Sequence, residues 1–364
     1  MWPRRIAVLL ILPAGLAVAA VPSTTLPVAF ASAEPECTAR VTDLGDRTIQ
    51  WLPGPAADVD ALDQWCRAVG PPVYIPTPSS VDGNLPPPVE ALTVLTWNAH
   101  LAEGRLDELV RALRDGRFTN GAPVTHFVLL VQELFRRADV VPAFLPGARS
   151  AFAIRARAVE SPDVNEYARE LGLSVLYVPS MRNGAELFED RGNAIVSTEP
   201  LSQPIALELP FERQRRVTIG AAIDVMRHGV RSTLRIVDAH LEPLSSPRSL
   251  WVFRNPRERQ IAAILDFLSG SRFEDDVAWA GTVLGGDFNT IQGGIDEQTY
   301  RDARAWGTST VDEDRRGTHY MGRLDYLFFR LPDGWIGTTK RLAEKFGSDH
   351  HPVLGTMRPA AGDR

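Results

Sequence analysis

Polar side chains suited to binding a metal ion or a phosphate group stand at the ends of several short apolar segments of the sequence. Each segment is about as long as a buried strand, and an amide, a carboxylate or an imidazole follows or precedes it. These side chains are Asn98, Glu133, His240, Asp287, Asn289, Asp325, Asp349 and His350. Because strand interiors bury the backbone while their polar ends meet at one rim, we expect these groups to converge on one site.

Two pairs of polar residues have an informative spacing along the sequence. Asp287 and Asn289 are two residues apart, so both would point the same way along an extended backbone. His350 and His351 stand side by side after Asp349, in a chain with 7 histidines in 364 residues. A single polar residue at a strand end is usually a turn or cap residue, but so many endings of this kind in one chain indicate a functional site.

The elements that must position these residues are short strands alternating with amphipathic helices. Strands are predicted over residues 92–97, 127–131, 173–178, 194–198, 217–225, 231–239, 283–286, 324–329 and 353–357. Helices are predicted over residues 58–69, over residues 105–114, and from residue 256, behind an Asn255 cap, to about residue 268. A hairpin turn over residues 227–229 argues against a purely parallel sheet. We expect one α/β domain over residues 91–358 and a disordered tail over residues 359–364.

Residues 1–33 have the layout of a secretory signal peptide. Arg4 and Arg5 precede an apolar run, and Ala31-Ser32-Ala33 offers a cleavage site. A retained membrane anchor is the alternative, but the run is short for a span of about 20 residues and contains Pro13. Cleavage would remove two arginines and no acid, which takes the net charge from -6 to -8. We therefore expect a secreted protein, extracellular or periplasmic.

Residues 34–90 read as a proline-rich extension in front of the domain. Its prolines, among them Pro71-Pro72, Pro76 and residues 86–88, make regular elements unlikely around them. Cys37 and Cys66, the two cysteines of the chain, both lie here, and in an oxidising compartment we expect them to pair. Such a disulfide would stabilise the fold by about 3 kcal/mol. Two free thiols are the alternative.

Seven short motifs resemble, in the same order, those of the endonuclease/exonuclease/phosphatase superfamily, which has the deoxyribonuclease-I-like fold. They are Thr96-Trp97-Asn98, Gln132-Glu133, Gly192-Asn193-Ala194-Ile195, Ala239-His240-Leu241, Gly286-Asp287-Phe288-Asn289, Leu324-Asp325-Tyr326 and Ser348-Asp349-His350. The resemblance spans residues 92–357 and, with the signal sequence, is typical of a secreted bacterial member. It implies a four-layer α/β/β/α sandwich of two mixed β-sheets flanked by helices.

The resemblance also implies a metal-dependent phosphoric ester hydrolase. Glu133 would be the principal metal ligand, assisted by Asn98 and Asp349, and Mg²⁺ is the expected cofactor, with Mn²⁺ or Ca²⁺ as alternatives. His100, two residues after Asn98, stands where some relatives carry an acid, which argues against a second metal site.

Catalytic roles are implied for five residues of the motifs. His350 would be the acid/base histidine, oriented by Asp325, because a carboxylate fixes the tautomer of a histidine and raises its pKa. His240 and Asn289 would hold phosphate oxygens, and Asp287 would position or deprotonate the attacking water. The choice of base between Asp287 and His350 stays open at this point.

The expected substrate is a phosphoester, and nucleic acid is the preferred class. Asn193 and Arg216 are the candidate substrate-binding residues, although a charge of -8 gives no long-range attraction to a polyanion. A phospholipid or sphingomyelin headgroup is the alternative, because Trp251 and Phe253 could contact a membrane peripherally. Inositol phosphate is a further alternative, as is an inactive relative that serves as a binding module. No obligate protein partner is inferred.

Overall fold

Two mixed β-sheets pack face to face in the computed structural model, which describes residues 49–76, 91–142, 161–181, 188–227, 229–243, 255–269, 279–291 and 294–359. One sheet has six strands in the order β1-β7-β8-β9-β10-β12. Their bounds are β1 Gln50–Leu52, β7 Ser202–Glu208, β8 Val217–Arg227, β9 Val230–His240, β10 Trp279–Asp287 and β12 Asp325–Arg330. Parallel pairs, such as β9 with β10, stand beside antiparallel pairs, such as β10 with β12.

The other sheet has eight strands in the order β11-β13-β14-β3-β4-β6-β5-β2. Their bounds are β2 Val73–Ile75, β3 Thr93–Asn98, β4 Phe127–Arg137, β5 Ser174–Met181, β6 Glu189–Ser197, β11 Thr310–Asp312, β13 Trp335–Arg341 and β14 Val353–Pro359. β3 and β4 run parallel at its centre, whereas β14 and β6 pair with them antiparallel.

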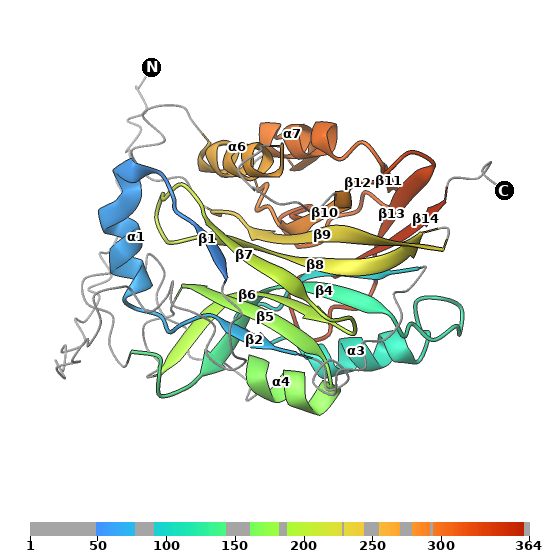
Figure 1. Ribbon diagram of the computed structural model, residues 1–364, viewed down its shortest axis with the longest axis horizontal. Coiled ribbons are helices and arrows are strands. Elements are labelled where there is room, and N and C mark those ends of the chain that lie inside the picture. The colour runs from blue at the N-terminus through green and yellow to red at the C-terminus, as the bar shows by residue number, and fades with distance from the viewer. Residues whose placement is uncertain are drawn as a thin grey trace, which may run out of the picture.

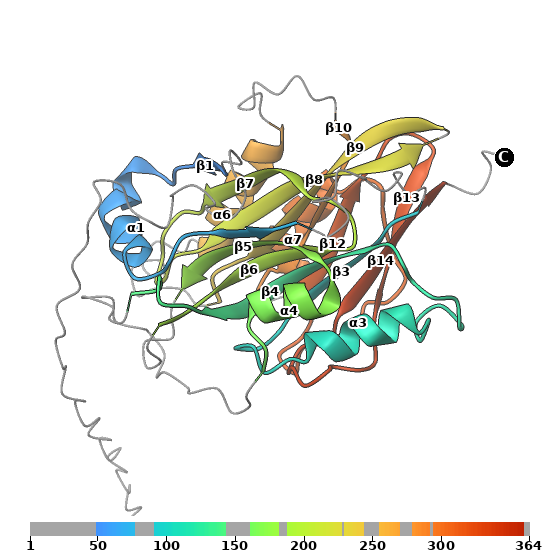
Figure 2. The same ribbon diagram turned by 60° about the horizontal axis from the view of Figure 1, so that its bottom comes forward.

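Helices cover the outer faces of both sheets (Figures 1 and 2). α6 (Pro256–Ser269) and α7 (Gln298–Trp306) lie over the six-stranded sheet, whereas α3 (Leu106–Arg114) and α4 (Val164–Leu171) lie under the eight-stranded sheet. α1 (Val59–Cys66) stands at the side, and the short 3-10 turns are η2 (Ala56–Asp58) and η3 (Gly294–Asp296). The predicted four-layer sandwich of two mixed sheets is confirmed.

The alternation of side chains along β4 shows why the central strands are apolar on both faces. Phe127, Leu129 and Val131 join the core beneath α3 and α4, while Val128 and Leu130 join the core between the two sheets. A third core lies between the six-stranded sheet and helices α6 and α7. Strands buried on both faces appear in the sequence as continuous apolar runs, which is why most of them were predictable.

The helices were predicted less completely than the strands. In α3, Leu106, Leu109, Val110 and Leu113 are buried on one face, as their spacing predicts. Helices α4 and α7 were not predicted, nor were strands β7, β11 and β13. The start of α4 nevertheless carries a local signal, because Asp163 and Glu166 form a capping box.

Residues 49–76, the described part of the proline-rich segment 34–90, are more regular than expected: α1 lies within the helix predicted over residues 58–69, but two strands were not predicted. β1 pairs in parallel with β7, and β2 pairs antiparallel with β5 at the edge of the other sheet. β2 lies between Pro72 and Pro76, where an edge strand tolerates a missing N–H donor. These pairings join residues more than a hundred positions apart, so no local pattern reveals them.

Several sequence predictions concern residues outside the described ranges. They are the signal peptide, Cys37, the Trp251 and Phe253 pair, and residues 360–364, and they stay predictions. Cys66 is buried at the end of α1. Among the described residues, no helix is both long and apolar enough to cross a membrane.

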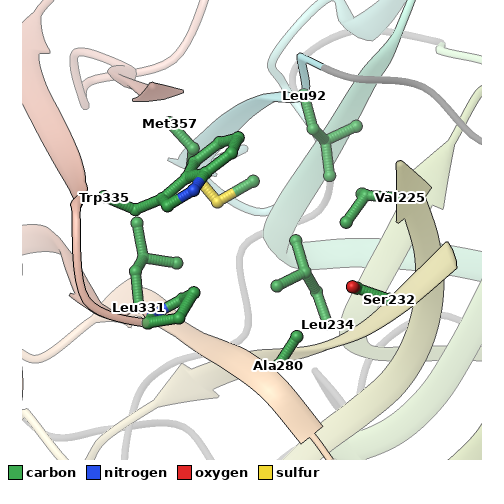
Figure 3. A pocket seen from close by; sticks show the side chains of 9 residues that line it. Leu92, Val225, Ser232, Leu234, Ala280, Leu331, Trp335 and Met357 are labelled. Atoms are coloured by element: carbon green, nitrogen blue, oxygen red, sulfur yellow. The ribbon is translucent and has the colours of Figure 1, made fainter. Parts of the chain in front are cut away.

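An apolar pocket lies at the end of the sandwich where β3, β9 and β10 begin (Figure 3). Leu92, Leu234, Ala280, Trp335 and Met357 line it, together with Val225, Ser232, Leu331 and Pro332. The polar strand ends lie at the opposite end of the same strands. This pocket is therefore separate from the candidate site.

Candidate functional site

Three of the predicted site residues lie side by side where the six-stranded sheet ends. In the strand register Asp287 of β10 is the partner of His240 in β9 and also of Asp325 in β12. Nε2 of His240 lies 3.7 Å from Oδ2 of Asp287. Strand pairing alone thus brings together residues that are far apart in the sequence.

Gly286 allows β10 to approach β9 closely at this point. Its φ is +145°, and an added Cβ would lie 1.7 Å from the carbonyl oxygen of Ala239. Any side chain here would push the two strands apart, so the glycine keeps Asp287 beside His240.

The eight-stranded sheet contributes Asn98 and Glu133 to the same rim. Asn98 is the last residue of β3, and its Nδ2 donates to Oδ2 of Asp287 at 2.9 Å, across the two sheets. A β-bulge in β4 lets two residues, Gln132 and Glu133, face the single residue Asn193 of β6. Glu133 has a φ of +59°, so the bulge turns its side chain out of the strand alternation and toward Asn98.

The loop after β3 holds Glu133 with a strained backbone. His100, Leu101 and Ala102 have φ values of +47°, +55° and +61°. The backbone N–H of Leu101 donates to Oε2 of Glu133 at 2.8 Å, and that of His100 donates to Oδ1 of Asn98 at 2.8 Å. Three consecutive left-handed residues without glycine each cost about 1–2 kcal/mol, and such strain concentrates at functional sites.

The Ser348-Asp349-His350 segment is anchored to the end of β3. Oγ of Ser348 donates to the backbone oxygen of Asn98 at 2.7 Å, and the backbone N–H of His350 donates back to that Oγ at 2.9 Å. Nε1 of Trp97 donates to the backbone oxygen of His350 at 3.2 Å. These three bonds bring Asp349 and His350 to the site from the far end of the sequence.

His350 is held between three carboxylates. Its Nδ1 lies 2.8 Å from Oδ2 of Asp325, while its Nε2 lies 3.7 Å from Oδ1 of Asp349 and 4.0 Å from Oδ2 of Asp287. Burial alone would lower the pKa of His350, but Asp325, Asp287 and Asp349 outweigh it and raise this pKa to about 10. His350 is therefore a cation at neutral pH, and its Nε2 lies between Asp287 and Asp349.

Burial is the largest influence on the pKa of Asp287. Burial, followed by the neighbouring charge of Asp325, raises the pKa of Asp287 to about 7, against the opposing effects of His350 and the Asn98 amide. A carboxyl with such a pKa accepts a proton readily near neutral pH.

Two histidines lie beside the carboxylate oxygens of Asp349, and only Oδ2 takes part in a hydrogen bond among the described residues. Nδ1 of His100 lies 3.0 Å from Oδ1, and Nε2 of His319 lies 3.1 Å from Oδ2. Burial would raise the pKa of Asp349, but these partners and His350 hold it below its usual range. The sequence analysis did not identify His319, which stands in a loop and ends no apolar strand.

Among the described residues, two groups have ligand atoms close enough together to hold a cation: Asp287, Asp325 and His350, and His319, Asp349 and His350. Glu133 reaches the same rim, with its Oε1 3.9 Å from Nε2 of His240, and carboxylate oxygens are the ligands that a hard divalent cation prefers. Asp287, Asp325 and Asp349 surround the His350 imidazolium, and the charge of Asp325 adds to the effect of burial in raising the pKa of Asp287. His319 does not fit as a ligand, because Met321 N–H donates to its Nδ1 at 3.2 Å and its Nε2 must then carry a proton. Asn98 directs its amide oxygen to the His100 N–H and its amide nitrogen to Glu133 and Asp287, so as placed it orients these acids.

Arg216 is a buried cation beside these groups. It is 2% exposed, and neither its Nε nor its Nη1 has a hydrogen-bond partner among the described residues. Burial lowers the pKa of Arg216, whereas Glu242, Glu133 and Asp287 oppose the decrease. Burial and the nearby Arg216 in turn hold the pKa of His240 well below its usual range, so His240 is a neutral imidazole.

The other arginines close to Arg216 and His240 in the sequence differ from Arg216. Arg215, equally buried, donates from Nε and Nη2 to Glu208 and from Nη1 to the backbone of Pro179. Arg257 pairs with Glu297 at 2.6 Å, and Arg259 pairs with Glu212 at 2.6 Å. These three arginines are structural, and Arg254 lies outside the described residues.

The side-chain amides of Asn193 and Asn289 each donate one hydrogen bond to the backbone. Nδ2 of Asn193 donates to the backbone of Val217 at 2.9 Å, while its buried Oδ1 has no partner within the described part of the chain. The expectation that Asn289 and Asp287 point the same way along an extended strand is wrong, because β10 ends at Asp287 and Asn289 has a φ of +50°. Its backbone N–H donates to Oδ1 of Asp287 at 2.9 Å, and its Nδ2 donates to the backbone of Leu241 at 3.0 Å.

Comparison with known proteins identifies the family. The model of the Endonuclease/Exonuclease/phosphatase family matches residues 95–350, and the chain therefore belongs to this family. Its members are generally phosphoester hydrolases, which typically use a divalent metal ion. No curated protein matches the chain significantly.

Solved structures with a similar fold have low sequence identity to this chain. The catalytic domain of human Nocturnin has 14% identity and a TM-score of 0.45, with 74% of this chain and 95% of that chain covered. Sphingomyelinase C from Streptomyces griseocarneus has 17% identity and a TM-score of 0.42, with 74% and 99% covered. A mannosyl-6-phosphatase from Bacteroides thetaiotaomicron has 11% identity and a TM-score of 0.43, with 73% and 99% covered.

Proposed function

We propose that the protein is a divalent-metal-dependent phosphodiesterase that acts on nucleic acid. One observation carries this proposal. Carboxylates that suit a cation lie at the same rim as a buried arginine, Arg216, that has unused N–H groups among the described residues. Burying a guanidinium without a hydrogen-bond partner is unfavourable unless an anion accepts its N–H groups. A phosphate group would be such an anion.

Glu133 would be the principal ligand of the cation, with Asp349 beside it. Mg²⁺ suits these oxygen donors, and Mn²⁺ or Ca²⁺ are alternatives. A bound cation would polarise a phosphoryl oxygen and offset the charge that develops on it. Asn98 would assist by holding Glu133 and Asp287 in place through its amide nitrogen.

Asp287 would serve as the general base and His350 as the general acid. Asp287 has a pKa of about 7, so it can take a proton from an attacking water, whereas His350, with a pKa of about 10, enters the reaction protonated. Asp325 holds Nδ1 of His350, which leaves Nε2–H to donate to a phosphate or leaving-group oxygen. His240, Arg216 and the amide of Asn193 would surround the phosphate oxygens, and Asn289 would support His240 through its bond to the next residue, Leu241.

Incubation with different phosphoesters tests the proposal. The protein is assayed with plasmid DNA, sphingomyelin vesicles and inositol phosphates, with and without Mg²⁺. Cleavage of DNA only when Mg²⁺ is present is the expected result. Turnover of sphingomyelin alone would assign the site to a lipid headgroup, and turnover of none of them with Mg²⁺, Mn²⁺ or Ca²⁺ would favour a binding module.

The Glu133→Gln variant tests the metal site within this assay. We expect its apparent dissociation constant for Mg²⁺ to rise at least about tenfold, because the variant loses one anionic ligand, and excess Mg²⁺ should partly restore the rate. Titration calorimetry with Mg²⁺ measures the affinity independently of activity. A defect that no Mg²⁺ concentration changes would count against the ligand role.

The rate should depend on pH in a bell-shaped manner. As the pH rises through about 7 Asp287 loses its proton and kcat increases, and as the pH rises through about 10 His350 loses its proton and kcat decreases. A cation favours the carboxylate form of Asp287, so higher Mg²⁺ should move the rising limb to lower pH. A rate that decreases as the pH passes upward through neutrality would contradict these roles.

A further inference from the structure

Tyr320 lies at the tip of a tight turn. In the folded site a chain of contacts through His319 and His350 connects it to Asp325. Its side chain is 80% exposed, more than any other large hydrophobic side chain among the described residues. The backbone N–H of His319 donates to the carbonyl oxygen of Gly322 at 2.9 Å, and the N–H of Gly322 donates back at 3.0 Å. The exposed ring is therefore carried by a closed turn.

The ring of Tyr320 is linked to the proposed catalytic histidine through His319. The centroids of the Tyr320 and His319 rings are 4.0 Å apart, and those of His319 and His350 are 4.6 Å apart. His319 is itself fixed, because its Nδ1 accepts from Met321 N–H at 3.2 Å and its Nε2 donates to Asp349 at 3.1 Å. Three rings thus lead outward from the site, and the last of them is open to solvent.

The surroundings of Tyr320 are charged rather than apolar, because its loop carries Glu313 and Asp314 as well as two arginines. Arg315 and Arg316 precede it in the same loop and are exposed, although Arg316 pairs with Asp314. Met321, 41% exposed, is the one other apolar side chain exposed in this described loop. A membrane-docking tip needs a broader apolar surface, whereas aromatic rings interleaved with basic residues are the usual surface for a single strand of nucleic acid.

We propose that Tyr320 is a stacking platform for a base of the substrate, next to the phosphate that His350 contacts. This inference rests on the proposed function and makes its substrate class more specific: a single-stranded or locally unpaired nucleic acid. Every nucleobase has a π face, so stacking on Tyr320 would favour bases in general rather than one sequence. The two ring contacts place Tyr320 one side chain beyond His350, with His319 between them.

Binding of a labelled single-stranded oligonucleotide, measured by fluorescence anisotropy, tests the platform. All variants carry Glu133→Gln as well, so that the oligonucleotide is not consumed. Tyr320→Ala is expected to raise the dissociation constant roughly 5- to 100-fold, which corresponds to the loss of one stacked base. Tyr320→Phe keeps the ring and should stay close to the parent. Val230→Ala removes another exposed hydrophobic side chain, 64% exposed, at the far β8–β9 turn and serves as the control.

An oligonucleotide of the same length without bases separates stacking from charge. The parent and Tyr320→Ala should bind this abasic chain equally, since no base is there to stack. Equal affinity of the two proteins for the normal oligonucleotide, or an equal loss on both oligonucleotides, would overturn the platform. A Tyr320→Ala defect confined to sphingomyelin vesicles would overturn it as well, in favour of a lipid surface.

The two proposals can fail separately. If Glu133-intact protein cleaves DNA and Tyr320→Ala binds the oligonucleotide normally, only the platform is wrong. If no phosphodiester is cleaved but oligonucleotide binding depends on Tyr320, the platform stands and the proposed hydrolysis fails. Because the Tyr320 side chain is exposed, its alanine variant should unfold at the same temperature as the parent, and this measurement accompanies each comparison.

Discussion

Replacing His350 with alanine is expected to lower kcat about 10²- to 10⁴-fold, because no other group would hold a proton at the position of its Nε2. The falling limb of the pH profile, which we assign to His350, should disappear at the same time. Both effects are measured in one series of steady-state rates across pH. A near-normal rate would remove His350 from the mechanism.

The His350→Gln variant separates two effects of the alanine variant: the loss of the catalytic proton and the loss of the hydrogen-bond partner of Asp325. His350→Ala leaves the buried carboxylate of Asp325 without its 2.8 Å contact, whereas His350→Gln retains an N–H that can reach it. We expect His350→Gln to be folded and equally slow. His126→Ala is the matched control, because His126 pairs with Glu199 at the opposite end of β4 and should have no effect on kcat.

Replacing Arg216 with methionine is expected to lower kcat/KM about 10²- to 10³-fold, the usual effect of removing a donor that stabilises charge on a reacting oxygen. Folding stability should stay the same or increase, because Nε and Nη1 of this buried cation have no hydrogen-bond partner in the described part of the chain, and such burial is unfavourable in the absence of substrate. Initial rates with DNA and urea unfolding measure the two effects. A substantial loss of stability together with normal activity would contradict the phosphate-binding role.

Arg215 provides a matched control one residue away. It is as deeply buried as Arg216, but it is paired with Glu208 and packs against Trp51. Arg215→Met should destabilise the fold by about 3–5 kcal/mol, because it leaves a buried carboxylate unpaired, while the folded fraction keeps its activity. Opposite effects at two adjacent arginines would be hard to explain except by their different partners.

Most of the site could be predicted because its chemistry stands at strand ends. A short apolar run must be buried as a strand, and the polar residue at its end must then reach an edge, so the order of such runs already marks Asn98, His240 and Asp287 as neighbours of one rim. The signal was weaker for helices α4 and α7, where local propensity does not reveal which face is buried.

What the sequence by itself determined is the set of buried strands and the polar groups at their ends, since hydrophobic periodicity is a local property. Only the tertiary structure decided how Glu133 turns at its bulge and which of Arg215 and Arg216 has a hydrogen-bond partner among the described residues. It also decided that His319 stands between Tyr320 and His350. Each of these depends on contacts between segments distant along the chain, such as the bond from Ser348 to Asn98. Hydrogen bonding and charge compensation act over a few ångströms in space, and sequence position does not record that distance.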